Sequence, residues 1–412
     1  MGKLRIYAYM GPIPKDWNKF RESDFKNDNY MNDEQYFALK EGGFTGVIAL
    51  MERTAEDAEL GLTLSDKYGL DYYVRDEINW DVSWDTTVFE RNAEFYRNCQ
   101  KHKSFKGVFI TDEPACETYP EIRALKDAFD KFFGKFPFGY YVNLLPTYAN
   151  DVTQLGAPYP EYIDKYIKEV GNDHVCFDHY PFTNRTVNGK KEDYMYADYL
   201  YNLDVVAKAC DKANVEMWTF IQAKNYCDNV HDIDYGALSY QIYVSLAFGS
   251  KAILYYTYWT WPGYYANEVD TADETGRVAI ISSKGKKTEK YYYAKDIHNE
   301  INAFSDIITD CKHLRTYMYA KNKAEIQFKD IEIADDSQFT GSAPIIVGEF
   351  LTPNGKKAYL VVNATNPYDG IVNTVRCDIK DVRVYNENRV DCKYLPFDLE
   401  MKPGKGFFVV EM

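Results

Sequence analysis

The chain has 412 residues, enough for one large α/β barrel with a small extra domain or for two to three ordinary domains. It carries 48 basic and 63 acidic residues, which gives a formal charge of −15, and 46% of its residues are hydrophobic. This composition excludes a disordered chain, and the negative charge argues against nucleic acid or an anionic membrane as a partner. The 38 tyrosines fit either a site that stacks on sugars or a Tyr-rich core.

Short apolar runs alternate with helical patterns eight times along the first three quarters of the chain. The expected strands are residues 4–9, 46–50, 72–76, 107–111, 139–143, 175–178, 217–221 and 252–256. Amphipathic stretches between them include residues 119–133, 194–213 and 232–248. This alternation predicts a (β/α)8 TIM barrel over residues 1–315. A doubly wound fold is disfavoured, because residues 10–14 read MGPIP where that fold has a Gly-rich phosphate turn.

The pattern changes after a last expected helix at residues 292–307. Strand-like runs follow at residues 324–328, 345–351, 357–363, 374–378, 381–385 and 406–410, separated by Pro-Asn-Gly, Asn-Pro and Pro-Gly turns. We therefore expect a small antiparallel β-sandwich over residues 316–412. This segment contains no catalytic constellation of its own.

The sequence predicts a cytoplasmic protein, because it shows neither a run long enough to span a bilayer nor a secretion signal. A secreted protein trimmed of its signal is the alternative. The eight cysteines include no CxxC pair, so they are interpreted as reduced thiols rather than as a zinc or disulfide framework. No cofactor and no metal are expected, since P-loop, HExxH and GxSxG motifs are missing from the sequence.

The most informative strand end is that of the fourth strand, where residues 107–114 read GVFITDEP. A buried strand runs into two adjacent carboxylates only if its end opens on a polar site, because desolvating an unpaired charge is costly. Aromatic surroundings and a neighbouring charge raise the pKa of such a carboxyl, which suits Glu113 to act as a general acid. The alternative is that Asp112 and Glu113 only cap the next helix.

With this motif the chain resembles the TIM-barrel glycoside hydrolases of clan A, and most closely the β-galactosidase-like, family 42-like group. In that clan the fourth strand ends in Asn-Glu-Pro, and its Glu is the acid/base. The resemblance implies a glycosidase in which Glu113 is the acid/base. It places Asp112 where the clan has the Asn that hydrogen-bonds the sugar 2-hydroxyl.

The seventh strand departs from the clan pattern. It ends in Gln222, whereas clan A enzymes have a nucleophilic Glu there, and an amide cannot act as a carboxylate nucleophile. Gln222 is still expected to hold a sugar hydroxyl or to orient a water. The best replacement is Asp178, which ends the sixth strand two strands away from Glu113. A short Asp on that strand favours a wide carboxyl separation, and therefore inversion of configuration.

Several readings remain open for the second carboxylate. Asp178 has the alternative roles of binding a hydroxyl or pairing with Arg75, and Asp112, Asp76 and Glu77 are rivals for its catalytic role.

Other polar and aromatic side chains at strand ends are expected to contact substrate, namely Asp76, Asn143, His179, Tyr180, Tyr256 and Trp259. For the aromatic residues near the eighth strand, including Tyr258 and Trp261, a lid over the barrel core is an equal alternative. The predicted partner is a carbohydrate substrate of a glycosidase. The rival functions are a carbohydrate-binding pseudoenzyme, marked by Gln222, and another carboxylate-driven barrel enzyme such as a lyase or isomerase. The sequence leaves the oligomeric state open.

Overall fold

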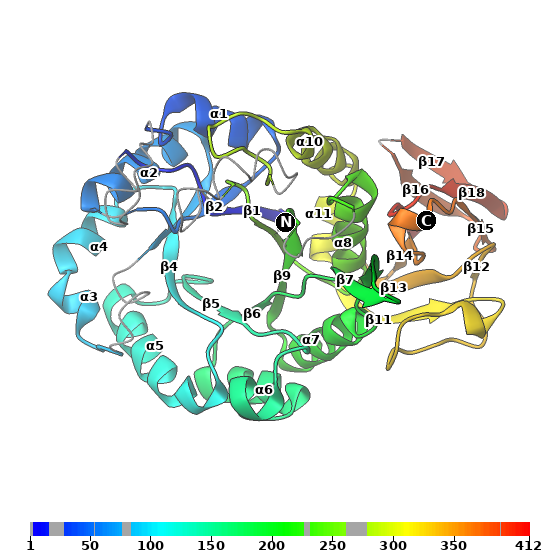
Figure 1. The fold of residues 1–412 in the computed structure, drawn as a ribbon, viewed down its shortest axis with the longest axis horizontal. Coiled ribbons are helices and arrows are strands. Elements are labelled where there is room, and N and C mark those ends of the chain that lie inside the picture. Colours follow the sequence, from blue (N-terminus) through cyan, green and yellow to red (C-terminus); the bar gives the residue numbers. More distant parts are fainter. Residues whose placement is uncertain are drawn as a thin grey trace. The chain divides into compact units, whose positions relative to one another are not determined.

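The computed structural model describes residues 3–15, 29–52, 54–75, 84–225, 231–260, 278–387 and 389–412. Eight strands form a closed barrel with the neighbour order β1, β10, β9, β6, β5, β4, β3, β2 (Figure 1). Their bounds are β1 (Arg5–Tyr9), β2 (Gly46–Ile48), β3 (Asp71–Arg75), β4 (Phe105–Asp112), β5 (Tyr140–Leu144), β6 (His174–Phe177), β9 (Glu216–Gln222) and β10 (Ala252–Tyr256). The predicted (β/α)8 barrel is confirmed.

Helices alternate with these strands along the chain. They are α1 (Asp33–Glu41), α2 (Ala55–Tyr68), α3 (Val88–Arg91), α4 (Ala93–Cys99), α5 (Tyr119–Phe133), α6 (Tyr159–Lys165), α7 (Tyr199–Ala213), α8 (Tyr235–Ala247), α10 (Glu289–Ile301) and α11 (Ser305–Asp310). The sequence fixes the ends of α2 clearly. The Thr54 side chain and the Asp57 carboxylate form a reciprocal capping box at its start, and Gly69 ends it in the left-handed conformation.

The chain divides into two compact units. One comprises Arg5–Asp178 and Leu254–Tyr291, and the other comprises Met1–Leu4, His179–Ile253 and Tyr292–Met412. In the first unit, α1, α2, α4 and α5 lie outside the strands β2 to β5 (Figure 1). The second unit contains α7, α8 and the antiparallel sheets.

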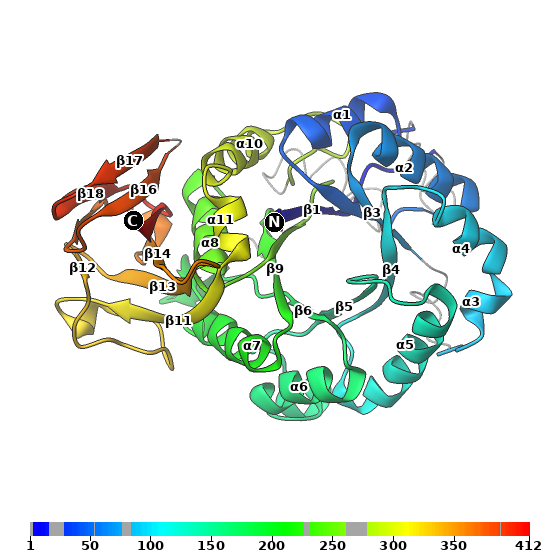
Figure 2. The same ribbon diagram turned by 180° about the vertical axis from the view of Figure 1, so that it is seen from behind.

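Two antiparallel sheets belong to the C-terminal part of the chain (Figure 2). The larger has the order β11, β13, β14, β19, β16, β17, and the smaller has the order β12, β15, β18. Their bounds are β11 (Lys312–Tyr319), β12 (Phe339–Gly341), β13 (Ile345–Leu351), β14 (Lys357–Asn363), β15 (Asn373–Cys377), β16 (Val382–Asn386), β17 (Arg389–Lys393), β18 (Phe397–Met401) and β19 (Gly406–Glu411). Strands from both sheets contribute to one buried hydrophobic cluster, which includes Phe339, Val361 and Phe407.

The predicted antiparallel strands of the C-terminal part are thus confirmed, whereas a separate β-sandwich domain stays a prediction. The boundary at residue 316 stays a prediction. The expected strand at 324–328 is wrong, because a 3-10 turn occupies Lys323–Glu325. The chain also forms a hairpin of β7 (Phe182–Val187) and β8 (Lys190–Met195). Its last two residues are the first two of the helix expected at 194–213, which begins only at Tyr199.

In the second unit, α8 packs against the larger sheet. Gly348 on β13 is required there, because a Cβ atom at this position would lie 2.1 Å from the backbone oxygen of Ala247. A side chain at residue 348 would force the helix and the sheet apart.

No helix of the described chain is long and apolar enough to cross a membrane. Seven of the eight cysteines lie in the described ranges, and all seven are free thiols. Cys227 lies outside the described residues.

Candidate active site

The pairing of β4 with β5 places two polar residues side by side at the carboxyl ends of the strands. Phe109 stands opposite Tyr141, but the register shifts between Phe109 and Thr111, so that Asp112 stands opposite Asn143. Without this shift Thr111 would occupy that place. Irregularities of this kind re-aim side chains beside active sites.

The amide of Asn143 joins two carboxylates. Its Nδ2 donates to Asp112 Oδ1 at 3.0 Å and to Asp178 Oδ1 at 3.3 Å. Asn143 and Asp178 are both buried, each 4% exposed, whereas Asp112 is solvent-exposed. The Oδ1 atom of Asn143 is buried and has no hydrogen-bond partner among the described residues. The structure therefore brings together three of the side chains that the sequence singled out.

Glu113 adjoins this group in a strained backbone conformation. Its φ of 51° is in the left-handed region, which residues other than glycine rarely adopt. Its N–H donates to the backbone oxygen of Asn143 at 2.9 Å, and the Tyr162 hydroxyl donates to the carbonyl of the following Pro114 at 2.7 Å. The Glu113 side chain is exposed, and no hydrogen bond fixes its carboxylate within the described structure. We name Asp112, Glu113, Asp178 and Asn143 the carboxylate cluster.

Burial raises the pKa values of all three carboxyl groups of the cluster, and neighbouring carboxylates add to the rise for Glu113 and Asp178. Desolvation raises the pKa of Glu113 to about 7, with a further contribution from the charge of Asp112. Desolvation raises the pKa of Asp178 well above its usual value, and the charges of Glu113 and Asp112 add to this effect. Desolvation also raises the pKa of Asp112. Hydrogen bonds from Asn143 and Tyr9 favour its ionised form and offset part of this rise. With a pKa of about 7, Glu113 is partly protonated near neutral pH.

Two tyrosines extend the cluster. The Tyr9 hydroxyl hydrogen-bonds Asp112, and the Tyr9 ring stacks on Tyr256 with centroids 5.7 Å apart and an interplanar angle of 29°. Tyr256 remains partly exposed, as a residue that contacts substrate must be. Sequence reasoning missed Tyr9, although it ends the first strand and thus shares a barrel edge with the other strand ends.

Gln222 is part of the architecture of the second unit. Its side chain is fully buried, its Oε1 accepts from the Phe182 N–H and its Nε2 donates to the Phe182 carbonyl, both at 3.1 Å. Its backbone forms two further bonds with the Gln241 amide. The expected contact with a sugar hydroxyl is not supported, because both polar atoms of the amide bind the backbone.

His179 and Tyr180 also lie in the second unit. His179 is buried, its ring packs against Tyr196 and Tyr199, and desolvation lowers its pKa. Tyr180 is partly exposed. The substrate contacts predicted for both residues stay predictions.

Trp259 does not fit the predicted role of a sugar-stacking residue. It is fully buried, and its ring lies against Tyr30 with centroids 5.0 Å apart. No face of the indole is open to a ligand, so the alternative of packing over the core describes it better. Asp76, Glu77 and Trp261 lie outside the described residues.

Arg75 is not the partner of Asp178. Its guanidinium donates to the Leu50 carbonyl at 2.6 Å, and the groups that shift the pKa of Asp178 are Glu113, Asp112 and Asn143. The expected alternative of an Asp178–Arg75 ion pair is therefore not seen.

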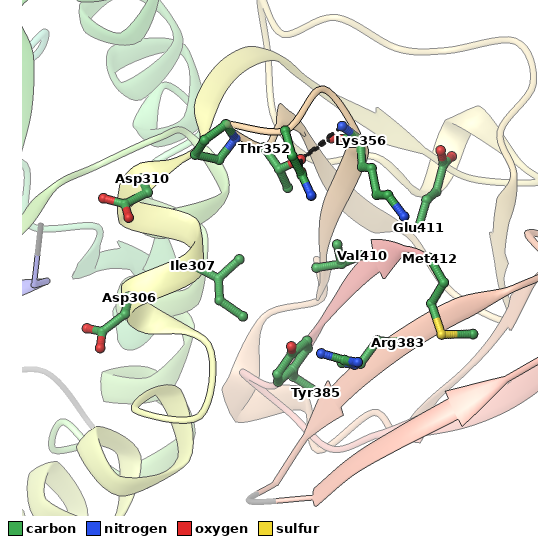
Figure 3. A pocket seen from close by; sticks show the side chains of 12 residues that line it. Asp306, Ile307, Asp310, Thr352, Lys356, Arg383, Tyr385, Val410, Glu411 and Met412 are labelled. Atoms are coloured by element: carbon green, nitrogen blue, oxygen red, sulfur yellow. Dashed lines mark hydrogen bonds between the residues drawn. The ribbon is translucent and has the colours of Figure 1, made fainter. Parts of the chain in front are cut away.

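A separate cavity of about 490 Å³ lies in the second unit, between α11, the β13–β14 turn, β16 and β19 (Figure 3). The side chains of Asp306 and Asp310 point away from it, while Ile307, Val410 and Tyr385 form apolar walls. Lys356, Arg383 and Glu411 also line this cavity. The carboxylate cluster is the better candidate for catalysis, because one buried amide joins its acids at the ends of barrel strands.

Comparisons with solved structures find the same fold in glycoside hydrolases. No protein-family model matches the chain, and no curated protein matches it in sequence. A solved structure described as a glycoside hydrolase is similar with a TM-score of 0.54 and 10% identity, covering 99% of this chain and 92% of the other. A family 27 β-L-arabinopyranosidase from Geobacillus stearothermophilus gives a TM-score of 0.50 and 9% identity, covering 100% and 96%. Such identities show a shared fold, and the reaction must be argued from the residues. The family 42-like resemblance is not confirmed.

Proposed function

We propose that this protein is a glycoside hydrolase, with Glu113 as general acid and Asp178 as the second carboxylate. The observation that carries the proposal is the carboxylate cluster, in which acidic groups with raised pKa values meet at the ends of β4 and β6. Hydrolysis of a glycosidic bond requires one protonated and one ionised carboxyl group. The fold shared with glycoside hydrolases agrees with this reading.

Glu113 meets the requirements of the proton donor. A pKa of about 7 leaves a large protonated fraction at neutral pH, and the exposed carboxyl is not fixed by a hydrogen bond. Because Glu113 and Asp178 repel one another as anions, a proton on Glu113 favours ionisation of Asp178. This is the pair of protonation states that the first chemical step needs.

The shared amide supports a second pairing within the cluster, Asp112 with Asp178. The two hydrogens of an NH2 group diverge by about 120°, so two oxygens at these distances from Nδ2 lie about 5.5 Å apart. That separation belongs to the retaining class, in which one carboxylate attacks the sugar directly. Tyr9 and Asn143 favour the ionised form of Asp112, which suits it to be the nucleophile of such a pair.

The proposal is tested on a panel of aryl glycosides with good and poor leaving groups. Glu113→Gln is expected to slow the poor leaving groups by roughly two to four decades and the activated ones much less. Asp178→Asn should abolish turnover in either pairing. The first-formed anomer, followed by proton NMR, separates them: inversion supports Glu113 with Asp178, and retention supports Asp112 with Asp178. A wild-type protein that binds sugars without releasing the aryl group contradicts hydrolysis.

The pseudoenzyme alternative rests on Gln222 and loses support from its contacts. Both polar atoms of the Gln222 side chain bind the Phe182 backbone, so this amide has an architectural role and does not by itself support a pseudoenzyme. We also propose that residues 1–315 form the catalytic domain and that residues 316–412 form an attached β-sandwich.

A further inference from the structure

The position of the Glu113 carboxyl group depends on its backbone. The side chain is exposed, and its carboxylate forms no hydrogen bond within the described structure. The φ of 51° is one that a residue with a side chain keeps only when its surroundings hold it there. An acid protonates a leaving group only from hydrogen-bonding distance, so the groups that hold this backbone control the proposed proton transfer.

Hydrogen bonds hold the backbone on both sides of this residue. The Glu113 N–H donates to the Asn143 carbonyl at 2.9 Å. On the other side, the Tyr162 hydroxyl donates to the Pro114 carbonyl at 2.7 Å. The same hydroxyl accepts the Leu145 N–H at 3.3 Å. A single oxygen atom of Tyr162 therefore links the chain after β4 to the chain after β5.

The Tyr162 side chain is itself held firmly. It lies in α6, it is fully buried, and its ring packs against Tyr119 and Tyr159 with centroids 5.7 and 6.1 Å away. The Tyr119 hydroxyl donates to the Tyr162 carbonyl at 3.3 Å. Burial raises the pKa of Tyr162, and the charges of Glu113 and Asp178 add to the rise, so the hydroxyl keeps its proton and remains a donor.

We infer that Tyr162 is a positioning residue of the proposed hydrolysis, whose hydroxyl holds Glu113 where it protonates the leaving group. It acts through the backbone of Pro114, because its buried side chain does not reach substrate. Without the hydroxyl, the Pro114 carbonyl loses this donor and the Glu113 backbone is free to relax out of the left-handed region. The inference rests on the proposed function, because it concerns the placement of the acid of the same reaction.

The test compares two leaving groups on the same sugar. A dinitrophenyl group leaves with little protonation, whereas an unsubstituted phenyl group needs the acid, so the ratio of their kcat/KM values reports the placement of the acid. The sugar is the one that the wild-type protein hydrolyses fastest among galactosides, glucosides, fucosides, mannosides and arabinosides of both anomers. Tyr162→Phe should lower kcat/KM for the phenyl glycoside by about ten- to a hundredfold and for the dinitrophenyl glycoside by less than about threefold.

Tyr140→Phe is the matched control. Tyr140 is a buried tyrosine of the same unit, and its hydroxyl donates to the Ile122 carbonyl at 2.8 Å. Both variants therefore remove a buried hydrogen bond to a carbonyl, but Tyr140→Phe should keep the wild-type ratio. A loss of folded protein lowers both kcat/KM values equally and leaves the ratio unchanged, so a purely structural role of Tyr162 would give both variants the same ratio.

A double variant tests whether Tyr162 acts through Glu113. In a Glu113→Gln background the acid is absent, so adding Tyr162→Phe should change the ratio by less than about twofold. A further fall of the ratio in the double variant overturns the inference. If Tyr162→Phe does not fold, Tyr119→Phe replaces it, because it removes the bond that anchors the Tyr162 backbone. It should change the ratio in the same direction, and an unchanged ratio overturns the inference.

The inference and the proposed function fail separately. If the wild-type protein hydrolyses the glycosides while Tyr162→Phe slows both leaving groups equally, or slows neither, the inference is overturned and hydrolysis stands. A wild-type protein that hydrolyses no glycoside of the panel overturns the proposed function, and the inference with it.

Discussion

Two buried amides at strand ends of the same barrel behave in opposite ways. Gln222 on β9 has both polar atoms bound by the backbone of Phe182. Asn143 on β5 donates to two carboxylates and leaves its oxygen atom without a partner in the described chain. From sequence alone both were expected to contact substrate. An amide whose oxygen and nitrogen are both hydrogen-bonded within the fold is architectural, whereas an amide with an unpaired polar atom is able to bind a ligand.

The largest expected effect comes from placing a carboxylate at the architectural amide. Gln222→Glu would set a buried charge against the Phe182 carbonyl, because no donor replaces Nε2. We expect the free energy of unfolding to fall by about 3–5 kcal/mol, measured by denaturant titration. Gln222→Met, which removes the hydrogen bonds without adding charge, is the control and should cost only about 1–3 kcal/mol. Glycoside hydrolysis gained by Gln222→Glu in an otherwise inert protein would instead establish the pseudoenzyme.

The next contrast concerns two aromatic residues that follow one another closely in the chain. Trp259 is buried against Tyr30, whereas Tyr256 is partly exposed and stacks on Tyr9. Trp259→Ala should destabilise the fold by about 3–5 kcal/mol. Tyr256→Ala should cost less stability and raise KM or Kd for a sugar ligand by about tenfold. Thermal unfolding and ligand titration on both variants decide the matter, and a reversed pattern would return Trp259 to the binding site.

Much of the barrel follows from the sequence, because buried parallel strands are continuous apolar runs. The expected strand at 252–256 coincides with β10 of the barrel. Outside the barrel, the expected strands at 345–351 and 357–363 coincide with β13 and β14. Strand β17 was missed, since most of its residues are exposed and show no apolar alternation. Strand β18 was missed although its apolar residues, Phe397, Leu399 and Met401, alternate with Asp398 and Glu400. The hairpin of β7 and β8 was missed because most of its residues are polar.

The carboxylate cluster could be predicted only in part. Reading strand ends found Asp112, Glu113, Asn143 and Asp178, since polar residues directly after apolar runs are unusual. The link between them could not be found, because it depends on the register shift in β4 that brings Asp112 opposite Asn143. The burial of Trp259 could not be predicted from the sequence either, because an aromatic side chain suits a buried core and a sugar-binding site equally well.

A smaller effect is expected from neutralising the buried acid. The pKa of Asp178 is raised in the folded protein, so the folded protein keeps a proton that the unfolded chain releases. Stability therefore falls as pH rises from about 4 towards the folded pKa. Asp178→Asn removes this fall and should gain about 1–2 kcal/mol relative to wild type at pH 8, with less gain at pH 4.5. Unfolding titrations at both pH values test it, with Asp151→Asn as the control, and a gain that does not depend on pH would contradict a raised pKa.

The smallest expected effect tests the link between Tyr9 and Asp112. Desolvation raises the pKa of Asp112. The hydrogen bond from Tyr9 favours the ionised form and therefore lowers this pKa. Tyr9→Phe keeps the ring that stacks on Tyr256 and removes only the hydroxyl. If Asp112 must be ionised for turnover, the acid limb of kcat/KM should move up by less than about one pH unit. The alkaline limb, which follows the Glu113 pKa of about 7, should stay in place. An acid limb that does not move would remove Asp112 from the reaction, and it would leave Glu113 with Asp178 as the catalytic pair.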